Sequence, residues 1–352
     1  MELENDAPPA LRPVAEAAFE AVERELGTGF APGAAAALVD ADGDVAAAWG
    51  GAAVLSPRIP VARDTVFDLA SLTKQVVTAP LASLLAAEGR WSLDDRLGRW
   101  LEGYGHPVTL RQCLTHTSGL VPHLPLWQLA STRAGMRDAV FAAPPGDQTR
   151  IVYSDLNYIL LGWAIESCAG RPLDELAAER LFRPLGMART LYLPPESIRD
   201  RLAASEIWGE VHDENCRALG GVTGHAGLFS TLDDLARYSA AMLRPGAHPA
   251  LPEAAIGEML RPQASDPPEE RGLGWRLHPW EQLAGWPEDA FGHTGFTGTS
   301  LVMSRSAGVA AVLLTNATHP RRRPEGAAAV RRAFHAAIAR RLPFRENPDV
   351  EA

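Results

Sequence analysis

The sequence predicts an α/β protein of the α+β type, with one antiparallel sheet built from both chain ends and flanked by helices. Segments with strand character lie near residues 33–54 and again beyond residue 271, whereas the residues between 91 and 270 contain short helices and long loops rich in Pro and Gly. We therefore expect a sheet lobe formed by residues 1–90 together with 271–352, and an inserted, mainly helical lobe formed by residues 91–270.

The first third of the chain supplies one strand pair between two helices. Residues 11–26, LRPVAEAAFEAVEREL, form an amphipathic pattern that ends at Gly27, which predicts a helix. The stretch GAAAALVDADGDVAAAWGGAAV, residues 33–54, predicts two strands around a DADGD turn. Residues 71–90, SLTKQVVTAPLASLLAAEGR, are strongly helical, and Gly89 is a natural helix stop.

The later segments place helices in the middle and strands towards the C-terminus. Helices are predicted at residues 170–187 and 230–243, the second with Ser230 or Thr231 as its cap. The remaining predicted elements are strands within RGLGWRLH (271–278), GFTGTSLVMSRS (295–306) and GVAAVLLTNA (308–317), and a closing helix within residues 325–342.

The composition and net charge indicate a globular protein and argue against some kinds of partner. The 352 residues are 46% hydrophobic and 22% charged, which is typical of a globular protein. A net charge of −10 argues against nucleic acid or an anionic membrane surface as partner, and no apolar run is long enough to span a membrane. Three cysteines and an N-terminus without a secretory signal lead us to expect a cytoplasmic protein. The sequence leaves the oligomeric state open.

Lys74 is the only lysine in the sequence, and every other cationic side chain is arginine. A coding bias explains why lysine is rare, but it does not explain the position of the one that remains. Ser71 lies three residues earlier, which puts both side chains on one face of a helix. A lysine, unlike an arginine, can lose its proton near neutral pH. We hypothesise that desolvation lowers the pKa of Lys74, which then activates Ser71 as a nucleophile.

Two further motifs carry side chains suited to the same chemistry. Tyr153, in VYSDLNYILLG, lies where a loop enters a helix, and its hydroxyl would share the proton transfer. Taken alone, Tyr153 is more typical of a buried aromatic residue whose hydroxyl has a hydrogen-bond partner. In GHTGFTG, His293-Thr294-Gly295 opens a strand, and a backbone N–H just after Gly295 would complete an oxyanion hole with that of Ser71. Taken alone, this motif is a glycine-rich strand entry.

In this order, the three motifs resemble those of serine hydrolases that share the class C β-lactamase fold, a group that includes penicillin-binding DD-peptidases, D-aminopeptidases and esterases. Their pattern is Ser-x-x-Lys, Tyr-x-Asn and Lys/His-Thr-Gly. The stretches LRQCLTHTSGL, GHAGLFSTLDDLARY and GLGW strengthen the resemblance, which runs from about residue 30 to 340. It implies one β-lactamase-like catalytic domain overall.

The resemblance implies acyl transfer without a metal or an organic cofactor. Ser71 would attack a carbonyl group while Lys74 and Tyr153 handle the proton. The N–H groups of Ser71 and, by position, Phe296 would hold the oxyanion, and water would then release the acyl group. The expected substrate is a small ester or amide or a short peptide, with β-lactams and D-amino-acid peptides among the candidates.

Two residues depart from the family pattern. Asp155 replaces the usual Asn and can only accept hydrogen bonds when ionised. It would pair with Lys74 and hold it charged, and Asn157 is the alternative amide donor. His293 replaces the lysine of many β-lactamases, and an imidazole is only partly charged at neutral pH. A substrate carboxylate would bind less firmly there, which argues against efficient β-lactam hydrolysis.

Parts of the sequence are also compatible with two other functions and suggest one other type of site. A DD-carboxypeptidase or transpeptidase acting on peptidoglycan peptides would need export. A catalytically silent binding protein on the same fold is favoured by Asp155 alone. The run His212–Asn215 does not predict a metal site, because adjacent loop residues seldom converge on one ion. His212 and His225 are candidates for lining the cleft, and a structural role is about as typical of His225.

Overall fold

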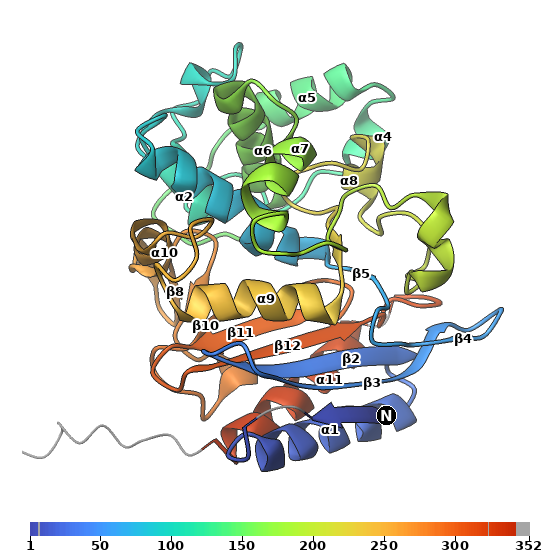
Figure 1. Ribbon diagram of the computed structural model, residues 1–352. Coiled ribbons are helices and arrows are strands. Elements are labelled where there is room, and N and C mark those ends of the chain that lie inside the picture. Colours follow the sequence, from blue (N-terminus) through green and yellow to red (C-terminus); the bar gives the residue numbers. More distant parts are fainter. Residues whose placement is uncertain (6–7, 323, 343–352) are drawn as a thin grey trace, which may run out of the picture.

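The computed structural model describes residues 1–5, 8–322 and 324–342, so residues 343–352 of the predicted sheet lobe lie outside the described part. Figure 1 shows the layers of the molecule. Helices α1 (Arg12–Gly27) and α11 (Pro324–Ala339) pack side by side beneath the central sheet. Helix α9 (Leu232–Leu243) covers the opposite face, and the helical lobe lies above it.

The main sheet is antiparallel and joins the two ends of the chain. Its strands follow the order β1 (Glu2–Asn5), β3 (Val45–Val54), β2 (Gly33–Asp40), β12 (Val309–Thr315), β11 (Ser300–Ser304), β10 (Phe291–Thr294), β9 (Arg276–Leu277), β8 (Glu269–Arg271) and β7 (Ala264–Asp266). The short β4 (Ile59–Pro60) pairs with β3. The pairing of β2 with β12 confirms the predicted sheet from both chain ends.

Alanine allows this sheet to be covered on both faces. Strand β2, GAAAALVD, is buried along nearly its whole length, because its small side chains let helices approach from either side. One hydrophobic core fills the space beneath the sheet and includes Phe19 of α1 and Phe334 of α11. A second core continues from the upper face into the helical lobe.

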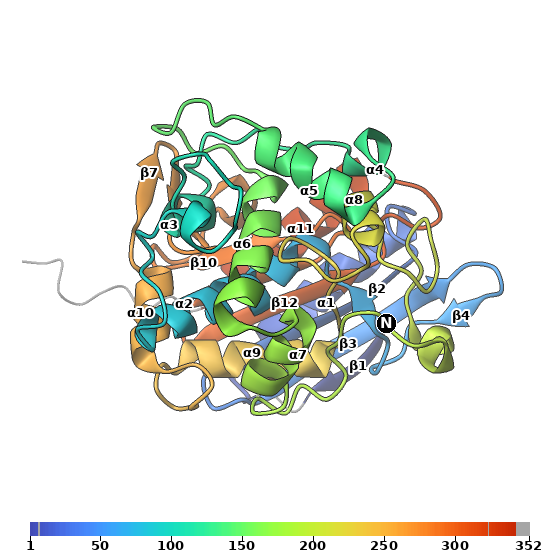
Figure 2. The ribbon, with the colours of Figure 1, turned by 90° about the horizontal axis from the view of Figure 1, so that it is seen from above.

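The part of the molecule above the sheet combines short helices with loops, and it includes α2 (Ala79–Ala87), which lies before the predicted lobe boundary at residue 91. Its other elements are α3 (Leu110–Leu114), α4 (Leu126–Leu129), α5 (Arg133–Ala142), α6 (Asp155–Ala169), α7 (Leu173–Ala177), α8 (Glu214–Ala218) and α10 (Glu253–Leu260). Figure 2 shows α6 crossing the middle of this lobe. Two short strands, β5 (Phe67–Asp68) and β6 (Phe229–Ser230), pair with each other.

Helix α9 belongs to the 91–270 segment in sequence but packs on β2 and β12 in space. Thr231 is its N-cap, in agreement with one of the two predicted caps. The predicted boundaries at residues 90/91 and 270/271 therefore describe the order of segments along the chain. The division into two lobes stays a prediction.

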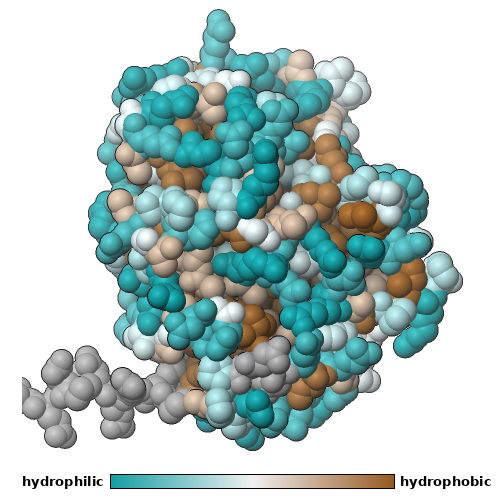
Figure 3. Space-filling view, in the orientation of Figure 1, coloured by the Kyte–Doolittle hydropathy of each residue, from teal (hydrophilic) through white to brown (hydrophobic). Residues whose placement is uncertain are grey.

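The part of the chain that the structure describes contains no helix long and apolar enough to cross a membrane. The face shown in Figure 3 is mainly hydrophilic, and its hydrophobic side chains are scattered among polar ones.

Replacing Phe334 by Ala is expected to lower the free energy of unfolding by about 3–5 kcal/mol, because it removes a fully buried ring from the lower core. Urea unfolding followed by tryptophan fluorescence would measure the change. Arg332→Ala, at an exposed position of the same helix, is the control and should shift stability by about 0.5 kcal/mol or less. Equal shifts for the two variants would contradict the proposed packing of α11.

Candidate active site

Ser71 lies in a tight turn that a buried carboxylate holds in place. Strand β5 ends at Asp68, and the 3₁₀ turn Ala70–Leu72 follows directly. Asp68 accepts hydrogen bonds from the backbone N–H groups of Ala70 (2.8 Å) and His212 (2.7 Å). Burial raises the pKa of the Asp68 carboxyl. Ala70 has a φ of +47°, a strained conformation for a residue with a Cβ, so the surrounding structure fixes the residue that precedes Ser71.

Lys74 opens a π-helical turn, Lys74–Thr78, and its side chain is fully buried. Its Nζ donates hydrogen bonds to Ser71 Oγ (2.9 Å), Asp155 Oδ1 (2.9 Å) and the backbone carbonyl of His225 (3.0 Å). These three acceptors use all three protons of an ammonium group. The structure therefore brings the predicted Ser71 and Lys74 together and adds Asp155 to the pair.

The predicted lowering of the Lys74 pKa is wrong. Burial does disfavour the charged form, but the carboxylate of Asp155, together with the nearby Tyr153, outweighs it, and the pKa of Lys74 is raised. Lys74 is therefore an ammonium ion at neutral pH. The expectation that Asp155 would pair with Lys74 and hold it charged agrees with the 2.9 Å ion pair.

Tyr153 lies just before helix α6 and lines the same cavity as Ser71. Lys74 Nζ is 5.0 Å from the centroid of its ring. The ring stacks on His293 at 5.6 Å and lies 4.5 Å from the ring of His116, centroid to centroid. These neighbours fix the orientation of the phenol beside the serine and the lysine.

The two residues whose N–H groups were predicted to form the oxyanion hole, Ser71 and Phe296, both line the cavity. Neither the N–H of Ser71 nor that of Phe296 donates to an acceptor within the described residues. The turn after β10 lies close to the segment that leads into Ser71. A Cβ on Gly295 would collide with Thr299 Oγ1 and with the carbonyl oxygen of Leu69. This close approach is the physical reason for a glycine in the His-Thr-Gly motif.

The cavity next to Ser71 has a volume of about 510 Å³. Its walls include Ser71, Tyr153, Trp280, Glu281, His293, Thr294, Gly295, Phe296 and three arginines, Arg271, Arg276 and Arg331. Glu269 pairs with Arg271. Arg276 forms no ion pair with any carboxylate in the described part of the chain, and its guanidinium lies 5.0 Å from the Trp280 ring centroid. A chain of net charge −10 thus has a locally cationic cavity.

His293 does not contribute to that charge. Burial, reinforced by Arg271 and Lys74, lowers the pKa of His293 well below its ordinary value. The imidazole is therefore neutral at neutral pH, and its Nδ1 lies 2.9 Å from the carbonyl oxygen of Thr294. This agrees with the expectation that His293 would hold an anion less firmly than a lysine would.

The structure directs Asn157 away from the site. Its Oδ1 accepts from Ser118 Oγ at 2.5 Å, its Nδ2 lies 3.3 Å from His116 Nδ1, and its side chain is fully buried. The suggestion that Asn157 replaces the family amide donor is therefore wrong, because both ends of its amide already have partners.

Neither candidate histidine is among the residues that line the catalytic cavity. The ring of His225 is buried between Thr223 Oγ1 (2.9 Å) and Asp213 Oδ1 (3.0 Å), and only its carbonyl reaches Lys74. His212 stacks on the exposed ring of Phe296 at 5.5 Å. Within the described residues, no group of three or more His, Cys, Asp or Glu side chains is arranged to hold a metal ion.

Sequence reasoning missed the three arginines of the cavity. Arg276 directly follows the GLGW stretch, but nothing in the spacing of a chain so rich in arginine distinguishes it. Its contacts in the folded chain distinguish Arg276, because its guanidinium lies over the Trp280 ring and forms no ion pair with a carboxylate of the described residues.

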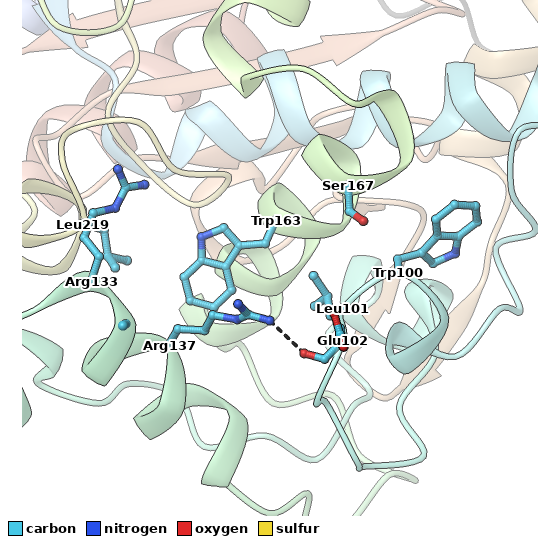
Figure 4. A pocket seen from close by; sticks show the side chains of 9 residues that line it. Trp100, Leu101, Glu102, Arg133, Arg137, Trp163, Ser167 and Leu219 are labelled. Atoms are coloured by element: carbon cyan, nitrogen blue, oxygen red, sulfur yellow. Dashed lines mark hydrogen bonds between the residues drawn. The ribbon is translucent and has the colours of Figure 1, made fainter.

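A second hollow lies on the helical lobe and shares no residue with the catalytic cavity. Figure 4 shows Trp163 and Ser167 of α6 facing Arg133 and Arg137 of α5 across it. Ser167 is its only serine, and no lysine, histidine or tyrosine lines the hollow beside it. The cavity at Ser71 is therefore the candidate active site.

The chain resembles known proteins over nearly its whole length. A family model described as Beta-lactamase matches residues 19–335. A protein of Escherichia coli K12, whose name proposes a D-alanyl-D-alanine carboxypeptidase, is 30% identical over 77% of this chain and 75% of its own. The N-acetylmuramyl-L-alanine amidase of Bacillus subtilis is 29% identical over 85% of this chain and 80% of its own.

A solved class C β-lactamase superposes with a TM-score of 0.78 at 20% identity, over 94% of this chain and 99% of its own, which shows the shared fold. The residues matched by the family model include Ser71, Lys74 and the strand that carries His293. The chain is a serine hydrolase of the β-lactamase family.

Proposed function

We propose that this chain hydrolyses a small ester or amide through an acyl-enzyme on Ser71. The observation that carries the proposal is the 2.9 Å hydrogen bond from the buried Lys74 ammonium to Ser71 Oγ, beside a cavity lined by Ser71 and Phe296, whose N–H groups have no acceptor among the described residues. An ammonium ion there stabilises the negative charge that develops on the serine oxygen as it attacks.

In the proposed acylation step, Ser71 Oγ forms a bond to the substrate carbonyl carbon. Because Lys74 already carries its proton, the Tyr153 hydroxyl relays the transfer: it accepts the proton of Ser71 and hands its own to the leaving oxygen or nitrogen. The bond to the leaving group breaks as the tetrahedral intermediate collapses. Water then attacks the acyl group, and the same relay returns a proton to Ser71 Oγ.

We further propose that the substrate carries a carboxylate close to the scissile bond. The neutral His293 supplies no charge, whereas Arg276 is a half-buried cation without a carboxylate partner in the described part. Burial lowers the pKa of Arg276, which makes a bound anion a favourable neighbour. Short peptides with a free C-terminal carboxylate fit this requirement, which is compatible with the carboxypeptidase activity named for the E. coli relative.

A serine-reactive phosphonate is expected to label the wild-type chain once, at Ser71. Ser71→Ala should abolish labelling, and Tyr153→Phe should slow it by about 10²–10⁴-fold because the proton relay is lost. Intact-protein mass spectrometry with peptide mapping would measure both. Ser167→Ala, which changes the serine of the second hollow, is the matched control and should label normally. An unlabelled wild type would favour the silent binding protein instead.

Lys74 is expected to keep its proton to above its ordinary pKa of 10.5. Because it is the only lysine, a chain grown with [¹³Cε]-lysine gives a single resonance whose shift follows its charge. A raised pKa means that the ammonium is present at neutral pH and is lost only as the pH rises beyond that value. Asp155→Asn should lower the midpoint, since burial then acts with less opposition. A wild-type midpoint below 10.5 would contradict the raised pKa, and a midpoint near neutral pH would restore Lys74 as the base.

Arg276→Gln is expected to reduce kcat/KM for a carboxylate-bearing ester by about tenfold or more, the loss of one charge-assisted hydrogen bond, and to leave its neutral counterpart almost unchanged. Suitable pairs are 3-carboxyphenyl acetate with phenyl acetate, and monophenyl glutarate with phenyl pentanoate. They place the carboxylate on the leaving group or on the acyl group. Arg133→Gln, in the second hollow, controls for the change in net charge. Equal losses for charged and neutral esters would refute the carboxylate requirement.

A further inference from the structure

Arg331, on the inner side of helix α11, is a buried cation bound to backbone carbonyls. Its exposed fraction is 8%, and no carboxylate of the described residues pairs with it. Its Nε donates to the carbonyls of Gly298 (3.3 Å) and Thr299 (3.2 Å), and its Nη2 donates to the carbonyl of Gly295. All three carbonyls belong to the turn between β10 and β11, which also contains Phe296.

Burying a guanidinium without a counter-ion is costly, and burial lowers the pKa of Arg331 to about 10. The side chain still carries its charge at neutral pH. Packing beneath the sheet does not require this cation, because apolar side chains fill the rest of that core. The charge is therefore explained by what it holds, namely three carbonyl oxygens that point towards one planar donor group.

The same turn is tied from its other side to the segment that leads into Ser71. Thr297 Oγ1 donates to the carbonyl of Asp68 at 2.8 Å, and Thr299 Oγ1 donates to that of Leu69 at 3.2 Å. The carbonyl of Thr297 accepts from Thr315 Oγ1 at 2.9 Å. The Phe296 N–H thus lies in a turn whose backbone is fixed on both sides, while its ring is 52% exposed and contacts His212 and Arg322.

From these contacts we propose that Arg331 is a positioning residue for the oxyanion hole. It holds the 295–299 turn so that the Phe296 N–H stays aligned with the Ser71 N–H. The inference rests on the proposed acyl-enzyme mechanism and adds the element that keeps half of the oxyanion hole in place. Misplacing one donor of such a hole costs up to about 10²–10³-fold in kcat.

The test compares an ester with its thionoester, in which sulfur replaces the carbonyl oxygen. Sulfur is a longer and poorer acceptor, so an aligned pair of N–H donors favours the ester. We expect Arg331→Met to lower the ester-to-thionoester ratio of kcat by about tenfold or more, with a smaller effect on KM. Arg331→Lys, which keeps the charge but loses the planar fork, should recover part of the ratio. Rates are normalised to sites titrated by the phosphonate.

The ratio separates positioning from general loss of structure, because a smaller folded fraction lowers both rates equally and leaves it unchanged. Thr299→Val removes a tie on the opposite side of the turn and should lower the ratio as well. Arg332→Met, an exposed arginine on the same helix, is the matched control and should keep the wild-type ratio. A labelled, active Arg331→Met with the wild-type ratio would overturn the inference alone, whereas an unlabelled wild type would overturn the proposed function.

Discussion

The buried ammonium of Lys74 is the constraint on which the active site depends. A cation without contact with water must have every proton accepted, and here the acceptors come from three separate parts of the chain. Ser71 belongs to the 3₁₀ turn just before Lys74, Asp155 begins helix α6 of the helical lobe, and the carbonyl of His225 belongs to the loop before β6. One side chain therefore fixes the helical lobe against the segment that carries the nucleophile.

The sheet supplies the second half of the geometry. Pairing of β2 with β12 joins the two ends of the chain, and β11 and β10 are the next strands of the sheet. The turn between β10 and β11, which carries Phe296, therefore lies next to the segment that leads into Ser71. The threonine hydroxyls of that turn donate to carbonyls of residues 68 and 69. The two N–H groups of the proposed oxyanion hole thus come from segments more than two hundred residues apart, joined by hydrogen bonds.

Local patterns were sufficient to predict most of the fold. The amphipathic run that became α1, the DADGD turn between β2 and β3, and Gly89 after α2 all lie where the sequence places them. Asn157 was a failure of the same local reasoning: two residues on a helix differ by about 200° in direction, so it does not share a face with Asp155. Helical geometry alone would have excluded it.

Charge was harder to predict than position, because it depends on contacts across the fold. The raised pKa of Lys74 depends mainly on Asp155, which lies 81 residues later in the sequence. No sequence spacing predicts that these two side chains approach within 2.9 Å. The same is true of Arg276 and Arg331. Within the described residues, neither guanidinium forms an ion pair with a carboxylate, and only the folded chain reveals this.

The single lysine therefore requires a different explanation from the one its rarity first suggested. A lysine kept for easy loss of its proton would have a lowered pKa, and that of Lys74 is raised. What distinguishes it from arginine here is shape. An ammonium directs three donors tetrahedrally from one small atom and satisfies a hydroxyl, a carboxylate and a carbonyl at 2.9–3.0 Å, whereas a planar guanidinium spreads its donors over a fork. Because Lys74 is already fully buried, the larger guanidinium would have to displace neighbouring groups to lie beside Ser71. Compactness, together with a charge that balances Asp155, is the property that this position demands.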